Sequence, residues 1–182
     1  MAKDIKTYYE QSYIDNTLRL REVLQTLPSF TKDYFRAVEP TTSAKTRISY
    51  AYDIRVFFHF LIENNPIYHD YTTTQFTLQD LERVEPIDIE EYLEYLKVYK
   101  ADDNQVITNG EKGLARKFSS LRSFYRYFYR HQMIEKNPTI FVDMPKLHDK
   151  AIIRLDIDEV ALLLDYVENC GKELTGQKKV YY

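Results

Sequence analysis

Glycine is absent from the first hundred residues of this sequence, and that absence restricts the fold more than any other feature. The 182 residues contain four glycines, and all of them follow residue 109, at Gly110, Gly113, Gly171 and Gly176. Tight β-hairpins draw heavily on glycine because their central residues need positive φ. The sequence therefore predicts helices, rather than paired strands, for most of the chain.

Apolar residues recur at helical spacing, and prolines separate the helical segments. Helices are expected at 4–27, 43–64, 77–82 and 111–133. A short helix is also expected between an N-cap at Ser29 and Pro40, and another is expected to begin at Pro86. Residues 101–110 are expected to form a polar loop and 137–150 an extended linker. A last helix is expected to begin near Asp156 or Asp158 and to end before Gly171.

Most kinds of catalytic or cofactor chemistry lack their sequence signals. Cys170 is the only cysteine, which excludes an internal disulfide and is typical of a reducing cytoplasm. The four histidines have no metal-ligand spacing, and no glycine-rich phosphate loop occurs. No apolar run is long enough to span a bilayer. We therefore expect a cytoplasmic protein without a metal or cofactor.

Positive charge is concentrated in one segment of an otherwise acidic chain. The net charge is −3, yet residues 111–136 hold seven lysines and arginines against two glutamates, which makes this segment +5 and the remainder −8. For a polyanion partner the field of one face matters more than the total charge. The segment is therefore the first candidate for a binding surface.

On a helical wheel, the basic segment divides into an apolar and a polar face. Leu114, Phe118, Leu121, Tyr125 and Phe128 fall on the side expected to face the core, and Arg122 lies nearer to that side, where we expect it to support packing. The remaining polar side chains suit phosphates and base edges of duplex DNA. The candidate DNA-binding residues of this helix are Lys112, Arg116, Lys117, Ser119, Ser120, Ser123, Arg126, Tyr127 and Arg130.

The predicted helix 43–64 has a narrower polar stripe that we assign to the same surface. Its candidate DNA-binding residues are Lys45, Thr46, Arg47, Ser49 and Tyr52. Two other interpretations stay open for the basic helix. It is either a solvated face, although such faces usually interleave both signs of charge, or the binding surface of a helical protein-interaction module with an acidic partner.

Three segments resemble the tyrosine site-specific recombinases, or phage integrases, and above all their Xer-type members. "SAKTRISYAYDIRVFFHFLI" is similar to the family's first core-binding helix. "LARKFSSLRSFYRYFYRHQMIEKNPTIFVDMPK" is similar to the family's basic, serine-bearing helix and the turn after it. "RLDIDEVALLLDYV" is similar to the first helix of the catalytic domain, with Asp156 at the capping position. Gly113 departs from the Thr or Ser of many members, which removes one expected phosphate contact.

The resemblance implies an all-α fold with a SAM-like four-helix core-binding domain that clamps duplex DNA. It divides the chain into an amino-terminal helical extension at 1–41, the core-binding domain at 42–140, a linker at 141–152 and the start of a truncated catalytic domain at 153–182. It also implies a tetramer on DNA. The catalytic residues of the family are expected beyond this chain, because Tyr181 and Tyr182 come too early to be the nucleophile and no catalytic arginine motif occurs. The chain alone is therefore expected to be inactive.

Overall fold

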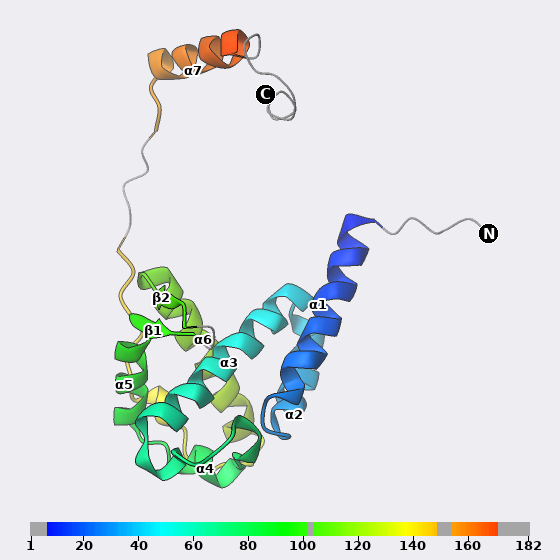
Figure 1. Ribbon diagram of the computed structural model, residues 1–182, viewed down its shortest axis with the longest axis vertical. Coiled ribbons are helices and arrows are strands. Elements are labelled where there is room, and N and C mark those ends of the chain that lie inside the picture. The colour runs from blue at the N-terminus through cyan, green and yellow to red at the C-terminus, as the bar shows by residue number, and fades with distance from the viewer. Residues whose placement is uncertain (1–6, 102–103, 149–153, 171–182) are drawn as a thin grey trace, which may run out of the picture. The chain divides into compact units, whose positions relative to one another are not determined.

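The chain folds mainly into helices, as the sequence predicts, in a computed structural model that describes residues 7–101, 104–148 and 154–170. It forms two compact units, one of residues 1–147 and the other of residues 148–182. The α-helices are α1 (Tyr8–Gln25), α2 (Thr31–Val38), α3 (Ala44–Asn64), α4 (Leu78–Arg83), α5 (Pro86–Tyr95), α6 (Glu111–Arg130) and α7 (Ile157–Cys170) (Figure 1). Short 3₁₀ turns, η1 (Glu39–Thr41), η2 (Pro66–Tyr68), η3 (Thr73–Gln75) and η4 (Pro138–Ile140), join several of them.

Side-chain caps fix where several helices begin. Thr7 and Glu10 form a capping box at the start of α1, and the Ser43 hydroxyl accepts a hydrogen bond from the Thr46 amide at the start of α3. These oxygens satisfy amides that have no partner inside the helix. The expected cap at Ser29 is wrong, because the N-cap residue of α2 is Phe30 and no side chain caps this helix.

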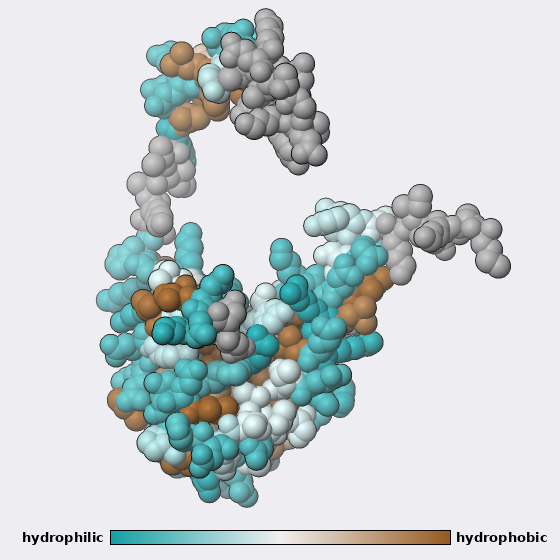
Figure 2. Space-filling model, in the orientation of Figure 1, coloured by the Kyte–Doolittle hydropathy of each residue, from teal (hydrophilic) through white to brown (hydrophobic). Residues whose placement is uncertain are grey.

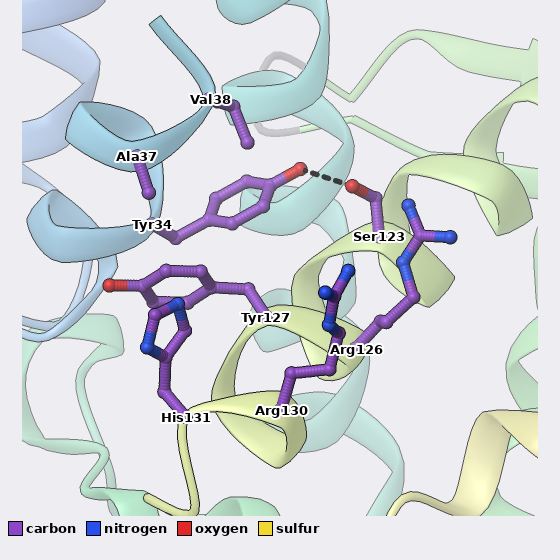
Figure 3. Close-up of a pocket in the computed structure, with 8 residues that line it drawn as sticks. All are labelled: Tyr34, Ala37, Val38, Ser123, Arg126, Tyr127, Arg130 and His131. Atoms are coloured by element: carbon purple, nitrogen blue, oxygen red, sulfur yellow. Dashed lines mark hydrogen bonds between the residues drawn. The ribbon is translucent and has the colours of Figure 1, made fainter.

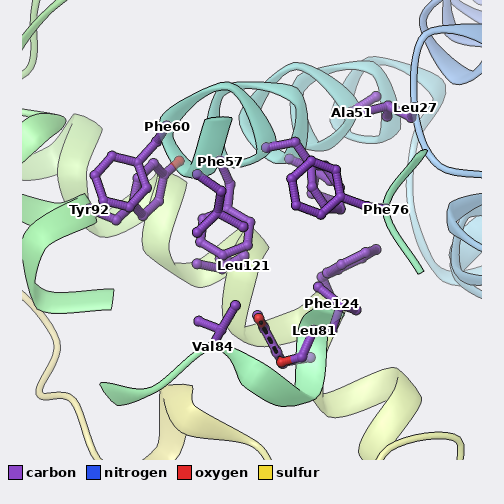
Figure 4. Packing of buried hydrophobic residues seen from close by; sticks show 14 of the residues in the cluster. Leu27, Ala51, Phe57, Phe60, Phe76, Leu81, Val84, Tyr92, Leu121 and Phe124 are labelled. Carbon is purple, nitrogen blue, oxygen red and sulfur yellow. Dashed lines mark hydrogen bonds between the residues drawn. The ribbon is translucent and has the colours of Figure 1, made fainter. Parts of the chain in front are cut away.

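Helix α3 is the centre of the first unit. It packs against α1, α5 and α6 and against the turns η2 and η3. Figure 4 shows its aromatic side chains reaching toward α5 and α6. The Phe57 ring lies 5.1 Å from that of Tyr92 on α5, and the Phe58 ring lies 6.4 Å from that of Phe124 on α6, centroid to centroid. Edge-to-face packing of this kind stabilises the core beyond the apolar area that it buries.

Buried tyrosines supply much of this core, which accounts for part of the 17 tyrosines in the sequence. Four of them are almost fully buried, and each donates its hydroxyl to a partner: Tyr34 to Ser123 Oγ, Tyr68 to the Asp80 carbonyl, Tyr92 to the Asp53 carbonyl and Tyr125 to the Leu81 carbonyl. A buried hydroxyl without a partner would destabilise the fold. Each ring therefore fills the core like phenylalanine while its hydroxyl remains hydrogen-bonded.

A short β-hairpin stands where the sequence predicts the end of a helix and a polar loop. Strands β1 (Val98–Lys100) and β2 (Val106–Thr108) pair antiparallel, with Tyr99 opposite Ile107. The prediction relied on glycine for hairpin turns, but Asn104 has φ of 62° here. Asparagine adopts this left-handed conformation more readily than most residues. Asn109 then joins the hairpin to α5, because its side-chain amide donates to the Leu96 carbonyl.

In the second unit the structure describes residue 148 and residues 154–170, and most of the latter form α7. The backbone amide of Glu159 donates to Asp156 Oδ1 and that of Asp156 to Glu159 Oε2, so the expected cap at Asp156 is confirmed. Leu162, Leu163 and Leu164 are exposed on this helix, and Figure 2 shows hydrophobic side chains on its surface. The expected end at Gly171 lies outside the described residues.

Candidate nucleic-acid interface

One stripe of polar side chains runs along the outer face of α6. Lys112, Ser119, Ser123, Arg126 and Arg130 recur at helical spacing and are exposed or partly exposed. The stripe is about 27 Å long at 1.5 Å per residue. The opposite side of α6 is buried in the core through Phe118, Leu121, Tyr125 and Phe128, as the wheel predicts. We call the five polar residues Lys112, Ser119, Ser123, Arg126 and Arg130 the α6 stripe.

Arg126 and Arg130 stand out in this stripe because no carboxylate among the described residues pairs with either of them. The acidic side chains of α2 and η1 are paired with other arginines. Asp33 pairs with Arg36 at 3.3 Å, and Glu39 pairs with Arg47 at 2.8 Å. The positive potential of the two arginines is therefore not neutralised within the described part of the chain.

Arg116 and Lys117, both predicted DNA-binding residues, instead bind the buried carboxylate of Asp53 on α3. The Arg116 guanidinium reaches both oxygens of Asp53 at 2.6 and 2.9 Å, and Lys117 Nζ lies 3.2 Å from Oδ1. Lys117 is buried, so its placement on a DNA-facing surface is wrong. The side chain of Arg116 remains 49% exposed, so part of its guanidinium still faces outward.

Ser120 and Arg47 are also buried, against the prediction. Ser120 is fully buried and donates its hydroxyl to the Lys117 carbonyl, because its flank of α6 faces the protein interior. Arg47 is 4% exposed and held by Glu39. A single-helix wheel cannot locate these side chains, since their burial depends on neighbouring elements.

The other predicted residues of α3 remain at or near the surface. Lys45 is exposed, Thr46 shares a 2.9 Å hydrogen bond with Ser43, and Ser49 donates its hydroxyl to the Lys45 carbonyl. Tyr52 is partly buried and carries the Arg55 guanidinium over its ring at 5.2 Å. Asp53 follows Ser49 by one helical turn and holds Arg116, so the polar surfaces of α3 and α6 meet at this ion pair.

Arg122 packs over the core ring of Phe118, which agrees with the packing role that the sequence suggested, and it also lines a cavity. Its guanidinium lies 5.6 Å from the Phe118 ring, while its side chain lines a cavity of about 620 Å³ together with Arg126 and Arg130. This cavity lies between α6 and residues 137–144. Long arginine side chains rest on apolar groups and keep their charge in water. The length of the arginine side chain, which a helical wheel does not represent, allows Arg122 to reach both the Phe118 ring and the cavity.

A second cavity, of about 350 Å³, lies on the other side of the α6 stripe, between α6 and α2 (Figure 3). Its polar lining includes Ser123, Arg126, Arg130 and His131, and Tyr127 is part of its wall. The Tyr34 hydroxyl donates to Ser123 Oγ at 3.1 Å, and burial raises the pKa of Tyr34 to about 12. The α6 stripe is thus bordered by a cavity on each side.

A sequence model described as the phage integrase N-terminal SAM-like domain matches residues 31–132, more than half of the chain. The chain belongs to the phage integrase family. The predicted recognition and the all-α SAM-like fold are thereby confirmed, with the β-hairpin as the one departure among the described residues. The matched residues 31–132 include α2, α3 and α6, so the polar surfaces of α3 and α6 both lie within the SAM-like domain of the family.

Curated relatives of this integrase-family chain are tyrosine recombinases. It is 32% identical to tyrosine recombinase XerC of Caldanaerobacter subterraneus subsp. tengcongensis over 78% of this chain and 40% of that protein. It is 34% identical to tyrosine recombinase XerC of Pediococcus pentosaceus over 68% of this chain and 35% of that protein. The chain thus spans about two fifths of the length of these relatives. No solved structure matches it.

Other chemistry is not evident in the described part of this integrase-family chain. Among those residues, no group of three or more histidine, cysteine, aspartate or glutamate side chains is arranged to hold a metal ion. None of the described helices has both the length and the apolar composition needed to cross a bilayer. Tyr181 and Tyr182, judged too early to be the nucleophile, lie outside the described residues.

Proposed function

We propose that this chain is the DNA-binding amino-terminal part of a tyrosine recombinase and that the α6 stripe contacts the backbone of duplex DNA. The observation that carries the proposal is the pair Arg126 and Arg130, exposed one turn apart with no carboxylate partner among the described residues. Guanidinium groups bind phosphate oxygens through paired N–H donors. Membership of the integrase family supports DNA as the polyanion.

In this proposal the surface residues have distinct roles. Lys112, Arg126 and Arg130 contact phosphates, while Ser119 and Ser123 donate hydroxyl hydrogen bonds. Arg116 contributes the exposed part of its guanidinium and is held in place by Asp53. The surface of α3 around Lys45, Thr46, Ser49 and Tyr52 extends the contact. Arg47, Lys117 and Ser120 act inside the fold.

The proposal also covers features of the whole recombinase. Residues 42–140 bind a recombination half-site and clamp the duplex, while residues 1–41 extend that domain and 141–152 link it to a catalytic domain that begins at 153. The full-length protein assembles as a tetramer on DNA in the cytoplasm and performs strand cleavage with residues outside this chain.

Charge reversal on the α6 stripe tests the DNA contact. The duplex affinity of the Arg126→Glu and Arg130→Glu variants is measured by fluorescence anisotropy over a range of salt concentrations. Each removed phosphate contact flattens the slope of log affinity against log salt by about 1. Arg21→Glu is the matched control, since Arg21 is exposed on α1, has no ion pair among the described residues, and changes the net charge equally.

Two outcomes would contradict the proposal. If both reversals leave duplex affinity unchanged at low salt while circular dichroism shows an intact fold, the α6 stripe is a solvated face. A salt slope that is shallow in the unaltered protein, with stronger binding to an acidic protein than to duplex DNA, would favour a protein-interaction module.

A further inference from the structure

The cavity between α2 and α6 has the chemistry of an anion site. Ser123 and His131 contribute polar groups to its wall, and Arg126 and Arg130 extend alongside one another near Ser123 (Figure 3). None of the residues that line this cavity is a carboxylate. A concave site with two arginines and a hydroxyl attracts anions, since oxygen acceptors that carry charge form the strongest hydrogen bonds with such donors.

Tyr34 also lines this cavity, and its hydroxyl is hydrogen-bonded to that of Ser123. Tyr34 is fully buried, and its hydroxyl donates to Ser123 Oγ at 3.1 Å. Because that bond occupies a lone pair of the serine oxygen, the proton of Ser123 is directed to another acceptor. A tyrosine hydroxyl is protonated at neutral pH, so Tyr34 is a donor there, and burial raises its pKa further, to about 12.

We propose that this cavity binds one phosphate group of the DNA backbone, with Ser123, Arg126 and Arg130 as contacts and Tyr34 as the residue that positions Ser123. The inference rests on the proposed function, because duplex DNA supplies the phosphate. Ser123 donates its proton to a phosphate oxygen, and the two guanidinium groups neutralise the charge. Such a contact fixes the register of the domain on the duplex without reading the bases.

A double-mutant cycle tests whether Tyr34 acts through Ser123. The variants Tyr34→Phe, Ser123→Ala and the double variant of the full 182-residue chain are compared for duplex affinity at one salt concentration. Each single change is expected to weaken binding by about threefold to tenfold, the usual effect of one lost hydrogen bond. The double variant is expected to bind no more weakly than Ser123→Ala alone.

Ser119→Ala is the control for coupling, since Ser119 lies one turn before Ser123 and does not line this cavity. The losses from Tyr34→Phe and Ser119→Ala are expected to multiply. The salt slope of Tyr34→Phe should equal that of the unaltered chain, because no charge is removed. If the losses from Tyr34→Phe and Ser123→Ala also multiply, Tyr34 does not act through Ser123 and the inference is overturned.

A titration with inorganic phosphate in the absence of DNA tests whether the cavity binds phosphate by itself. We expect saturable NMR shifts at the amides of Ser123 and Arg126, and their loss in Arg130→Gln but not in Arg21→Gln. Because this titration does not use the Tyr34→Phe variant, it still tests the phosphate site if that variant folds poorly. Phosphate shifts in a chain that fails to bind duplex would overturn the assignment to the DNA backbone and the proposed function together.

The opposite result separates the two proposals. If duplex binding depends on Arg126 as proposed, but neither Tyr34→Phe nor Ser123→Ala weakens it and inorganic phosphate shifts no amide of the cavity, the DNA contact stands. In that case the cavity is not a phosphate site.

Discussion

Removal of the Asp53 carboxylate is expected to destabilise the first unit strongly. Asp53 is 2% exposed and accepts three hydrogen bonds from the cations of Arg116 and Lys117. In Asp53→Ala the ammonium of Lys117, whose side chain is 10% exposed, loses its carboxylate partner while it remains buried. Loss of one member of a buried ion pair typically lowers the free energy of unfolding by about 3–5 kcal/mol.

Arg116 should contribute much less to that loss. Its side chain is 49% exposed, so water can replace part of what Asp53 provides. Exposed ion pairs stabilise proteins by about 0–1 kcal/mol. We therefore expect a decrease of about 3–5 kcal/mol for Asp53→Ala and of about 1 kcal/mol for Arg116→Ala, in which Asp53 keeps Lys117.

Urea unfolding followed by the near-ultraviolet dichroism of the tyrosines measures both values, because the buried tyrosines lie in the first unit. The Asp53→Ala and Lys117→Met double variant is the matched test, since an apolar pair replaces the buried charges and should restore most of the loss. A decrease below about 1 kcal/mol for Asp53→Ala, or a larger decrease for Arg116→Ala, would refute this account of the ion pair.

Two further predictions follow from the buried rings. Burial raises the pKa values of Tyr34 and Tyr68 to about 12, above the ordinary 10. The stability that their neutral hydroxyls provide is therefore complete below pH 10 and is lost as the pH rises toward 12. Free energies of unfolding measured between about pH 9 and pH 12 should fall, and a constant value would contradict this prediction. Phe118 on α6 is fully buried, and in the same urea measurement Phe118→Ala should lower the free energy of unfolding by about 3–5 kcal/mol. A loss as small as that of a surface substitution would contradict its position in the core.

The sequence predicts the helices well because their signals are local. Apolar spacing locates α3 and α6, and Asp156 marks the start of α7 through a contact only three residues away. The hairpin was missed because Asn104 takes the left-handed conformation that was expected only of glycine. Local rules thus succeed where each element depends on its own residues.

Details of the site were harder to predict because they depend on contacts between distant residues. The wheel places Arg126 and Arg130 at the surface, where the structure also has them. It cannot reveal that Asp53, more than sixty residues earlier, binds Arg116 and Lys117. Nor can it show that the Tyr34 hydroxyl reaches Ser123 across 89 positions of sequence. The composition of the surface was predictable, but the partners of its charges were not.

Helix α1 is anchored at one end only, and this has a consequence for local motion. Leu20 and Val23 are its buried residues, whereas Tyr8 and Tyr9 are more than four fifths exposed. Amides near Tyr9 and Tyr13 therefore exchange with solvent whenever the first turns fray, at a small cost in free energy. Amides near Val23 exchange only when α1 leaves α3. Protection against hydrogen exchange should thus increase steadily along a single helix, from its amino-terminal to its carboxy-terminal end.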